Sequence, residues 1–374
     1  MQHSPEILKI VEGALRSNAP QVAAYSELLA AKLEKEGHIR IAQSIRKKIG
    51  QAGHSCSTTS VSGRLEPVVP VDKDSRLSLG DVIYPALNES QVKLHKPVQE
   101  SVDEFLAFID KAHLLSAAGV GISPSMLIYG PPGCGKTRLA HHIAAQLNLP
   151  LITARCDTLI SSFLGSTAKN LRNLFDHAAS RPCVLFLDEF DAFAKARDDQ
   201  HELGELKRVV VSLLQNIDAL PDDTVLLAAT NHEELLDPAV WRRFAYRVQI
   251  PLPNRDTRTD LLKQFLGSFY PKDIKRIEEA TDGMNGAIIQ QACLAAIRSA
   301  VLAENETIDT NRLIIGLAKD QHQDIFGSSA LSDEEKVIKL RETNSKVFTV
   351  DRLSSIFGMS TGKISKLTSK GVAK

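Results

Sequence analysis

Hydrophobic and polar residues follow two patterns along the chain. Both end regions show the spacing of helices, whereas the central part combines short apolar runs with helical stretches. In residues 4–50 apolar side chains recur every three or four positions, which is the period of an amphipathic helix. Asn18 with Pro20, and then Gly37, interrupt this period, so one helix ends before the next begins. The helices predicted in this way span 4–16, 20–36 and 38–49.

Short apolar runs separated by amphipathic stretches characterise residues 77–252. The strands that these runs predict span 126–129, 150–156, 183–187, 224–229 and 247–251. Strands that alternate with helices form a parallel sheet with helices on both of its faces. From residue 253 to residue 320 the pattern is helical only, so a helical subdomain follows the sheet.

Composition separates the remaining segments. Residues 51–76 are rich in Ser, Thr, Gly and Pro and lack a period, which is typical of a flexible linker. The tail from about residue 331 has its own helical pattern, and we expect it to form a separate unit. The predicted domains are an N-terminal helical domain (1–50), the linker (51–76), an α/β subdomain (77–252), a helical lid (253–325) and a C-terminal segment (331–374).

Charge and cysteine content narrow the function classes. The chain carries 45 basic and 45 acidic residues, so no overall attraction to a polyanion is expected. Its 5 cysteines include no C-x-x-C pair, which favours reduced thiols over a disulfide framework or a zinc site. The N-terminus has no signal-peptide pattern, and no apolar stretch is long enough to span a membrane. We therefore expect a cytoplasmic protein without a membrane partner.

The most specific motif spans Gly130 to Thr137 and matches G-x-x-x-x-G-K-[ST], the phosphate-binding P-loop. It lies between a predicted strand and a predicted helix, where backbone N–H groups and the helix dipole favour phosphate. Lys136 would reach the β- and γ-phosphates of ATP, and the hydroxyl of Thr137 would ligate Mg²⁺. The nucleotide-binding residues predicted here are Gly130, Pro131, Pro132, Gly133, Cys134, Gly135, Lys136, Thr137 and Arg138.

Two further strands end in polar side chains suited to hydrolysis. Asp188 and Glu189 end one apolar strand, and Asn231 follows the next. Ligands of open α/β sheets bind beyond the carboxyl ends of the strands, which would bring these side chains to the phosphates. We expect Asp188 to hold Mg²⁺, Glu189 to orient the attacking water, and Asn231 to contact the γ-phosphate or that water.

These motifs resemble the AAA+ ATPases, and within them the AAA proper group with FtsH-like and spastin- or katanin-like members. The resemblance covers about residues 77–320 and includes GPPGCGKT, VLFLDEFD, AATN and LDPAVWRRF. It implies a P-loop NTPase sheet with an all-α lid, ATP and Mg²⁺ as cofactors, and a homo-hexameric ring. Arg242 and Arg243 would be arginine fingers that stabilise charge on the neighbouring subunit's nucleotide; a surface ion pair is the alternative.

The resemblance also assigns residues outside these motifs. Asn285 stands where the family's G-x-S-G-A motif has Ser, and Asn also caps helices, so we expect a helix to begin there. Gly286 and Ala287 would lie close to the nucleotide. The backbone of Asp81, Val82 and Ile83 would meet the adenine.

A third group of residues concerns the work that ATP would drive. Phe163, Leu164 and Gly165 match the family's aromatic pore loop, which faces the centre of the ring and grips an extended polypeptide; a buried core position for Phe163 is the alternative. FtsH-type members carry an H-E-x-x-H zinc protease, and the stretch from His201 to Glu205 lacks the second histidine. Any protease would therefore be a separate chain.

The C-terminal segment resembles a helix-turn-helix. Leu353, Ile356 and Phe357 would face a small core, Gly358 would allow the turn, and Ser360 would cap the second helix. Residues 351–374 hold five Lys or Arg against one Asp, so binding to the major groove of DNA is one interpretation and a protein-binding tail is the other.

The sequence thus predicts an ATPase ring that remodels, unfolds or disassembles proteins, with the N-terminal helices either recruiting a substrate or adaptor or capping the ring. The alternatives are a DNA-associated regulator and an ATPase that regulates a separately encoded protease or other partner enzyme.

Overall fold

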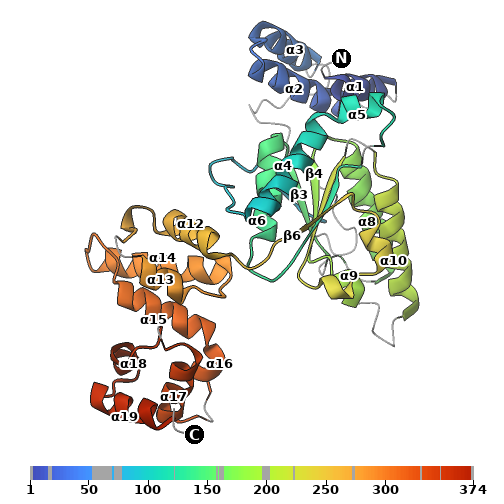
Figure 1. Cartoon of the computed structure of the whole chain (residues 1–374). Helices are drawn as coiled ribbons and strands as arrows, with labels where there is room; N and C mark the ends of the chain where they lie inside the picture. Colours follow the sequence, from blue (N-terminus) through green and yellow to red (C-terminus); the bar gives the residue numbers. More distant parts are fainter. Residues whose placement is uncertain are drawn as a thin grey trace. The chain divides into compact units, whose positions relative to one another are not determined.

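Figure 1 shows the computed structural model of the chain. The structure describes residues 3–15, 19–52, 70, 78–121, 123–156, 159, 164–195, 203–221, 224–271, 274–328, 331–345 and 347–371. Two compact units make up the molecule. Unit 1 comprises Met1–Val92, Lys96–Gly130 and Lys136–Ile250, and unit 2 comprises Lys93–His95, Pro131–Gly135 and Pro251–Lys374.

One sheet organises the described part of unit 1, and its strand order is β1-β3-β4-β5-β2-β6. The strands are β1 (Asp81–Ile83), β2 (Ser125–Tyr129), β3 (Leu151–Arg155), β4 (Val184–Asp188), β5 (Val225–Thr230) and β6 (Tyr246–Gln249). Strands β2 to β6 are parallel, which confirms the predicted parallel sheet. Strand β1 is the exception, since it pairs antiparallel with β3. Its three residues are too few to show an alternating pattern, and the sequence did not predict it as a strand.

The register of the sheet brings the carboxyl ends of its central strands side by side, at one end of the sheet. Tyr129 pairs with Thr230, so β2 and β5 end side by side. Strand β4 lies on the other side of β5 and ends at Asp188. The P-loop, the acidic pair and Asn231 therefore leave the sheet at the same edge.

Helices cover both faces of this sheet (Figure 1). The longer helices that cover the sheet are α4 (Lys96–Asp110), α6 (Lys136–Leu147), α8 (Leu164–Ala179) and α10 (Leu203–Asp218). Buried side chains of α8 and α10, including Leu171 and Leu213, pack in one core with Leu185 and Leu226 of the sheet. Shorter helices are α5 (Ala112–Ala117), α9 (Ala192–Lys195), η2 (Glu233–Leu235) and α11 (Pro238–Trp241).

The N-terminal helices run close to their predicted bounds, as α1 (Ser4–Leu15), α2 (Ala19–Lys35) and α3 (Ile39–Ala52). Ion pairs join neighbouring helices: Lys32 contacts Glu6 across α1 and α2 at 2.5 Å, and Arg46 of α3 contacts Glu27 and Glu34 of α2. Within the ranges that the structure describes, no helix has the length and apolar character needed to cross a membrane.

Among its described residues after Pro251, unit 2 contains helices joined by loops and no strand. Its helices are α12 (Arg255–Leu266), η3 (Gly267–Phe269), α13 (Lys275–Ala280), α14 (Gly286–Leu302), α15 (Thr310–Gln321), α16 (Gln323–Phe326), α17 (Asp333–Thr343), α18 (Val350–Phe357) and α19 (Thr361–Gly371). The tail differs from the separate unit that we expected, because Val337, Phe348, Leu353 and Ile364 are buried in the same core as Leu262 and the other lid side chains. A helical segment of about 40 residues rarely buries enough surface to be stable by itself, and the lid helices complete its core.

Candidate ATP site

The P-loop starts where β2 meets β6, and only glycine fits at that point. Gly130 has φ +135°, and a Cβ atom there would lie 2.2 Å from the carbonyl oxygen of Ile250. The loop returns to the sheet edge at α6, whose first residue, Lys136, is buried. Its Nζ donates a hydrogen bond of 2.7 Å to the Gly130 carbonyl. A helix N-terminus with a buried ammonium group beside it is an environment that favours phosphate.

The end of β4 meets the start of α6 through a direct hydrogen bond. The hydroxyl of Thr137 donates to Oδ2 of Asp188 at 2.9 Å, although the two residues are 51 positions apart. The other carboxylate oxygen of Asp188 accepts from the backbone N–H of Glu189 at 2.9 Å. A hydroxyl and a carboxylate oxygen side by side are the hard oxygen ligands that Mg²⁺ takes in nucleotide sites, so this pair fits the metal.

Glu189 has a backbone conformation that is unusual for its residue type. Its φ is +54°, in the left-handed region that a non-glycine residue adopts only at a cost of about 1–2 kcal/mol. The residue is exposed at the end of β4, while Phe190 behind it is buried and donates from its N–H to the Ala229 carbonyl at 2.9 Å. Such conformations cluster at functional sites, where the surroundings fix one side chain in place.

Asn231 follows the fully buried strand β5 and is joined to the loop after β4. Oδ1 of Asp191 accepts from the Thr230 hydroxyl at 3.1 Å and from the Asn231 N–H at 3.4 Å. The Thr230 hydroxyl in turn accepts from the N–H of His232 at 3.0 Å. The sequence pattern did not single out Asp191 or Thr230, although both flank predicted site residues.

The two arginines predicted as fingers differ in their surroundings. Arg242 is exposed. Arg243 is half-buried, and its guanidinium makes two hydrogen bonds of 3.1 Å to the carboxylate of Asp218 and one of 2.7 Å to the Ala239 carbonyl. Both line a cavity of about 370 Å³ together with Ser125, the first residue of β2. They therefore lie at the opposite end of the strands from the P-loop of the same chain.

The remaining predicted site residues of unit 1 that the structure describes lie on β1, α6 and α8. Asp81 and Ile83 are exposed on the edge strand β1, and Val82 is half-buried against the core. The guanidinium of Arg138 donates to the Gln91 carbonyl at 3.1 Å, so it supports the segment after β1. Phe163 lies outside the described residues. Leu164 and Gly165 are the first residues of α8. The adenine and pore-loop roles stay predictions.

Unit 2 contains the P-loop residues Pro131–Gly135 together with the start of α14. Asn285 caps this helix, since its Oδ1 accepts from the N–H of Ile288 at 2.9 Å, as expected for Asn in place of Ser. Its Nδ2 donates to the Pro132 carbonyl at 3.1 Å. The N–H of Ala287 donates to the carbonyl of Gly133, also at 3.1 Å. The predicted residues Gly286 and Ala287 thus lie beside the P-loop.

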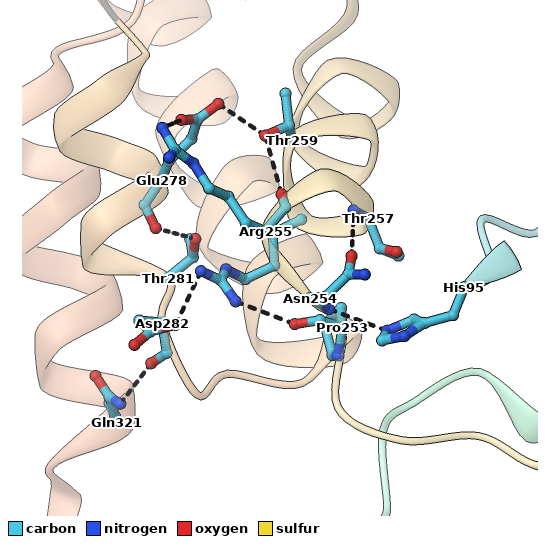
Figure 2. Close-up of polar contacts among 11 residues, drawn as sticks. His95, Pro253, Asn254, Arg255, Thr257, Thr259, Glu278, Thr281, Asp282 and Gln321 are labelled. Atoms are coloured by element: carbon cyan, nitrogen blue, oxygen red, sulfur yellow. Dashed lines mark hydrogen bonds and ion pairs between the residues drawn. The ribbon is translucent and has the colours of Figure 1, made fainter.

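A buried arginine, Arg258, contacts the loop that precedes Asn285, and Figure 2 shows the polar contacts around Pro253, Asp282 and Gln321. Arg258, on α12, donates to the carbonyl of Pro253 at 3.1 Å and pairs with the carboxylate of Asp282 at 2.9 Å. Gln321 donates to the Asp282 carbonyl at 3.1 Å. Asn254 accepts from the N–H of Thr257 and so caps α12. No motif in the sequence pointed to this cluster, because Asp282 and Gln321 are far from Arg258 along the chain.

Comparison with known proteins identifies the class that this fold and site define. Residues 126–252 match the model of the ATPase family associated with various cellular activities (AAA). An uncharacterized AAA family ATPase, y4kL, of Sinorhizobium fredii is 35% identical over 295 residues, which are 78% of this chain and 88% of that one. The chain belongs to the AAA family of ATPases, and its activity is ATP hydrolysis.

Two named relatives have more specific descriptions. A proteasome-activating nucleotidase of Methanoculleus marisnigri is 28% identical over 293 residues, 75% of this chain and 71% of that protein. An ATP-dependent zinc metalloprotease, FtsH, of Pseudomonas putida is 32% identical over 262 residues, 66% of this chain and 42% of that protein.

Proposed function

We propose that the chain assembles into a ring, a hexamer by resemblance, and couples ATP hydrolysis to the unfolding or disassembly of proteins drawn through its centre. The observation that carries the proposal is the division of the site. Thr137, Asp188 and Glu189 lie at the carboxyl ends of the strands, and Arg242 lies at their amino ends. An arginine in that position suits the nucleotide of a neighbouring copy. The relatives described as a proteasome-activating nucleotidase and as FtsH support work on proteins.

The proposal assigns a task to each group around the phosphates. Lys136 binds the β- and γ-phosphates, and it would leave its bond to the Gly130 carbonyl to do so. Thr137 and Asp188 would hold Mg²⁺, which neutralises charge on the phosphate oxygens when bound. Glu189 orients a water molecule in line with the γ-phosphate and polarises it. The amide of Asn231 contacts the γ-phosphate or that water and fixes its position.

Arg242 is assigned the trans role, because it is exposed while Arg243 anchors the same loop to Asp218. A subunit-mixing experiment tests this assignment. Glu189→Gln and Arg242→Ala proteins should each be inactive by themselves. In a random mixture of equal parts, about one quarter of the sites (half times half) combine an intact Glu189 with an intact neighbouring Arg242, and activity should return to that level. A mixture that stays inactive would mean that Arg242 acts within its own subunit.

Pulling on polypeptide is tested through the predicted pore loop. The ATPase rate of the wild type should rise when an unfolded polypeptide is added, and Phe163→Ala should abolish that rise while keeping the basal rate. An aromatic side chain can hold any backbone without reading its sequence, so the stimulation should not depend on the polypeptide chosen. Equal rates with and without polypeptide in both proteins would contradict direct gripping and favour a dedicated adaptor. Pull-down with Glu189→Gln would then search for that adaptor or for a separate protease partner.

A second candidate function is DNA binding by the tail, favoured by its geometry. Helices α18 and α19 are joined by a short turn, and Ser360 caps α19, as in a helix-turn-helix. Two of the five basic residues in 351–374 make contacts within the protein. Arg352 is buried, and Lys363 pairs with Glu334 at 2.7 Å. Lys366 is exposed.

The DNA test should therefore change the surface and leave the core intact. Deleting residues 346–374 would remove buried side chains and confound the result. Salt-sensitive binding of a duplex that Lys366→Glu weakens would support the DNA function. Duplex binding that is absent at low salt would leave α19 as a protein-binding helix.

A further inference from the structure

The loops after β4 and β5 are tied together by a buried carboxylate. Asp191 and Thr230 are 4% and 1% exposed, so their hydrogen bonds form away from bulk water. Asp191 lies inside the tight turn in which the N–H of Ala192 donates to the Glu189 carbonyl at 2.9 Å. Thr230 is the last residue of β5, directly before Asn231. One carboxylate oxygen, carried by the turn that follows Glu189, thus contacts the strand end that bears Asn231.

The Thr230 hydroxyl donates one hydrogen bond and accepts another. It donates to Asp191 at 3.1 Å and accepts from the N–H of His232 at 3.0 Å. Valine has nearly the same shape as threonine but can do neither, whereas serine can do both. Loss of one donor weakens the hydrogen bonding of a buried carboxylate, which favours a shift of the turn around it.

We propose that Asp191 and Thr230 are positioning residues that set the spacing between Glu189 and Asn231, so that both act on one water molecule at the γ-phosphate. The inference rests on the roles proposed above for Glu189 and Asn231. Asp191 and Thr230 are both buried, and each acts through its neighbour. A misplacement of about 1 Å at a reacting group can lower a rate by about 100-fold, so loss of this contact should reduce turnover strongly.

The test compares Thr230→Val with Thr230→Ser in the full chain. Thr230→Val should lower kcat by about 10- to 100-fold and leave the dissociation constant of ATP within about threefold of the wild type, because the P-loop is unchanged. Thr230→Ser should keep both values close to wild type. Asp191→Glu is a second variant, since it keeps the charge but moves the carboxylate outward by one methylene group, and it should also lower kcat selectively. A merely structural role would weaken ATP binding and turnover together.

A double variant that combines Thr230→Val with Asn231→Ala tests whether Thr230 affects kcat through Asn231. If Thr230 acts through Asn231, the double variant should be little slower than Asn231→Ala alone, since residues that act as a unit are non-additive. Full multiplication of the two effects, or wild-type kcat in both Thr230→Val and Asp191→Glu, would overturn the inference. Wild-type kcat in Asn231→Ala alone would instead refute the role proposed for Asn231, so the two failures can be told apart.

Discussion

The left-handed backbone of Glu189 predicts an unusual order of stability for two substitutions. Glycine adopts φ +54° without strain, so Glu189→Gly should relieve about 1–2 kcal/mol that Glu189→Ala retains. Glycine also gains about 0.4–1 kcal/mol of conformational freedom in the unfolded chain, which opposes this. The two ranges leave Glu189→Gly more stable than Glu189→Ala by about 0–1.6 kcal/mol, with a midpoint of about 0.8 kcal/mol, or about 2–3 °C in Tm for a unit of this size.

Thermal unfolding of the two variants measures this difference. The unfolding transition to compare is the one whose Tm rises when ATP is added, because a ligand stabilises the unit that binds it. Glu100 provides the control, since it is exposed in the second turn of α4, inside a helix where glycine is less stable than alanine by about 1 kcal/mol. Glu100→Gly should therefore melt below Glu100→Ala. The same order at both positions, with alanine the more stable, would refute the strain at Glu189.

Three further predictions concern the loop, the lid and the thiols. Gly130→Ala should abolish ATP binding and lower Tm, measured by titration and thermal unfolding, because its Cβ would meet the Ile250 carbonyl at 2.2 Å. Asn285→Ser should weaken ATP binding without lowering Tm, because it keeps the helix cap but loses the bond to the P-loop carbonyl, whereas Asn285→Ala should lower both. Burial raises the pKa of the Cys183 thiol to about 12, so mass spectrometry should find it unalkylated at pH 8 while the half-buried Cys134 reacts. The folded state holds the Cys183 proton more tightly, so the stability from this group is complete below about pH 9 and is lost as pH rises towards 12.

The sheet and its edge were predictable because their signals are local. Apolar runs mark β2 to β6, and the glycine pattern of the P-loop fixes where the phosphates bind. Asp188, Glu189 and Asn231 could be proposed because each directly follows a strong strand signal, and parallel strands end at one edge. These predictions needed the order of the elements but no knowledge of packing.

The features that the sequence did not reveal depend on contacts between distant positions. Asp191 looks like one more acidic residue until Thr230, 39 positions later, is seen to donate to it. Arg242 and Arg243 are equivalent in the sequence and differ only because Asp218 pairs with one of them. The tail looked independent because helical periodicity shows which face of a helix is buried but not what covers that face.

Glu189→Gln tests the central claim most directly, because it changes one exposed group at the end of β4 and leaves the P-loop intact. The measurement is a single-turnover experiment with radiolabelled ATP, in which binding and hydrolysis are followed on the same sample. The Glu189→Gln variant should bind ATP as tightly as the wild type and hold it without turnover. Rapid hydrolysis by Glu189→Gln would contradict the role of this carboxylate and with it the proposed site.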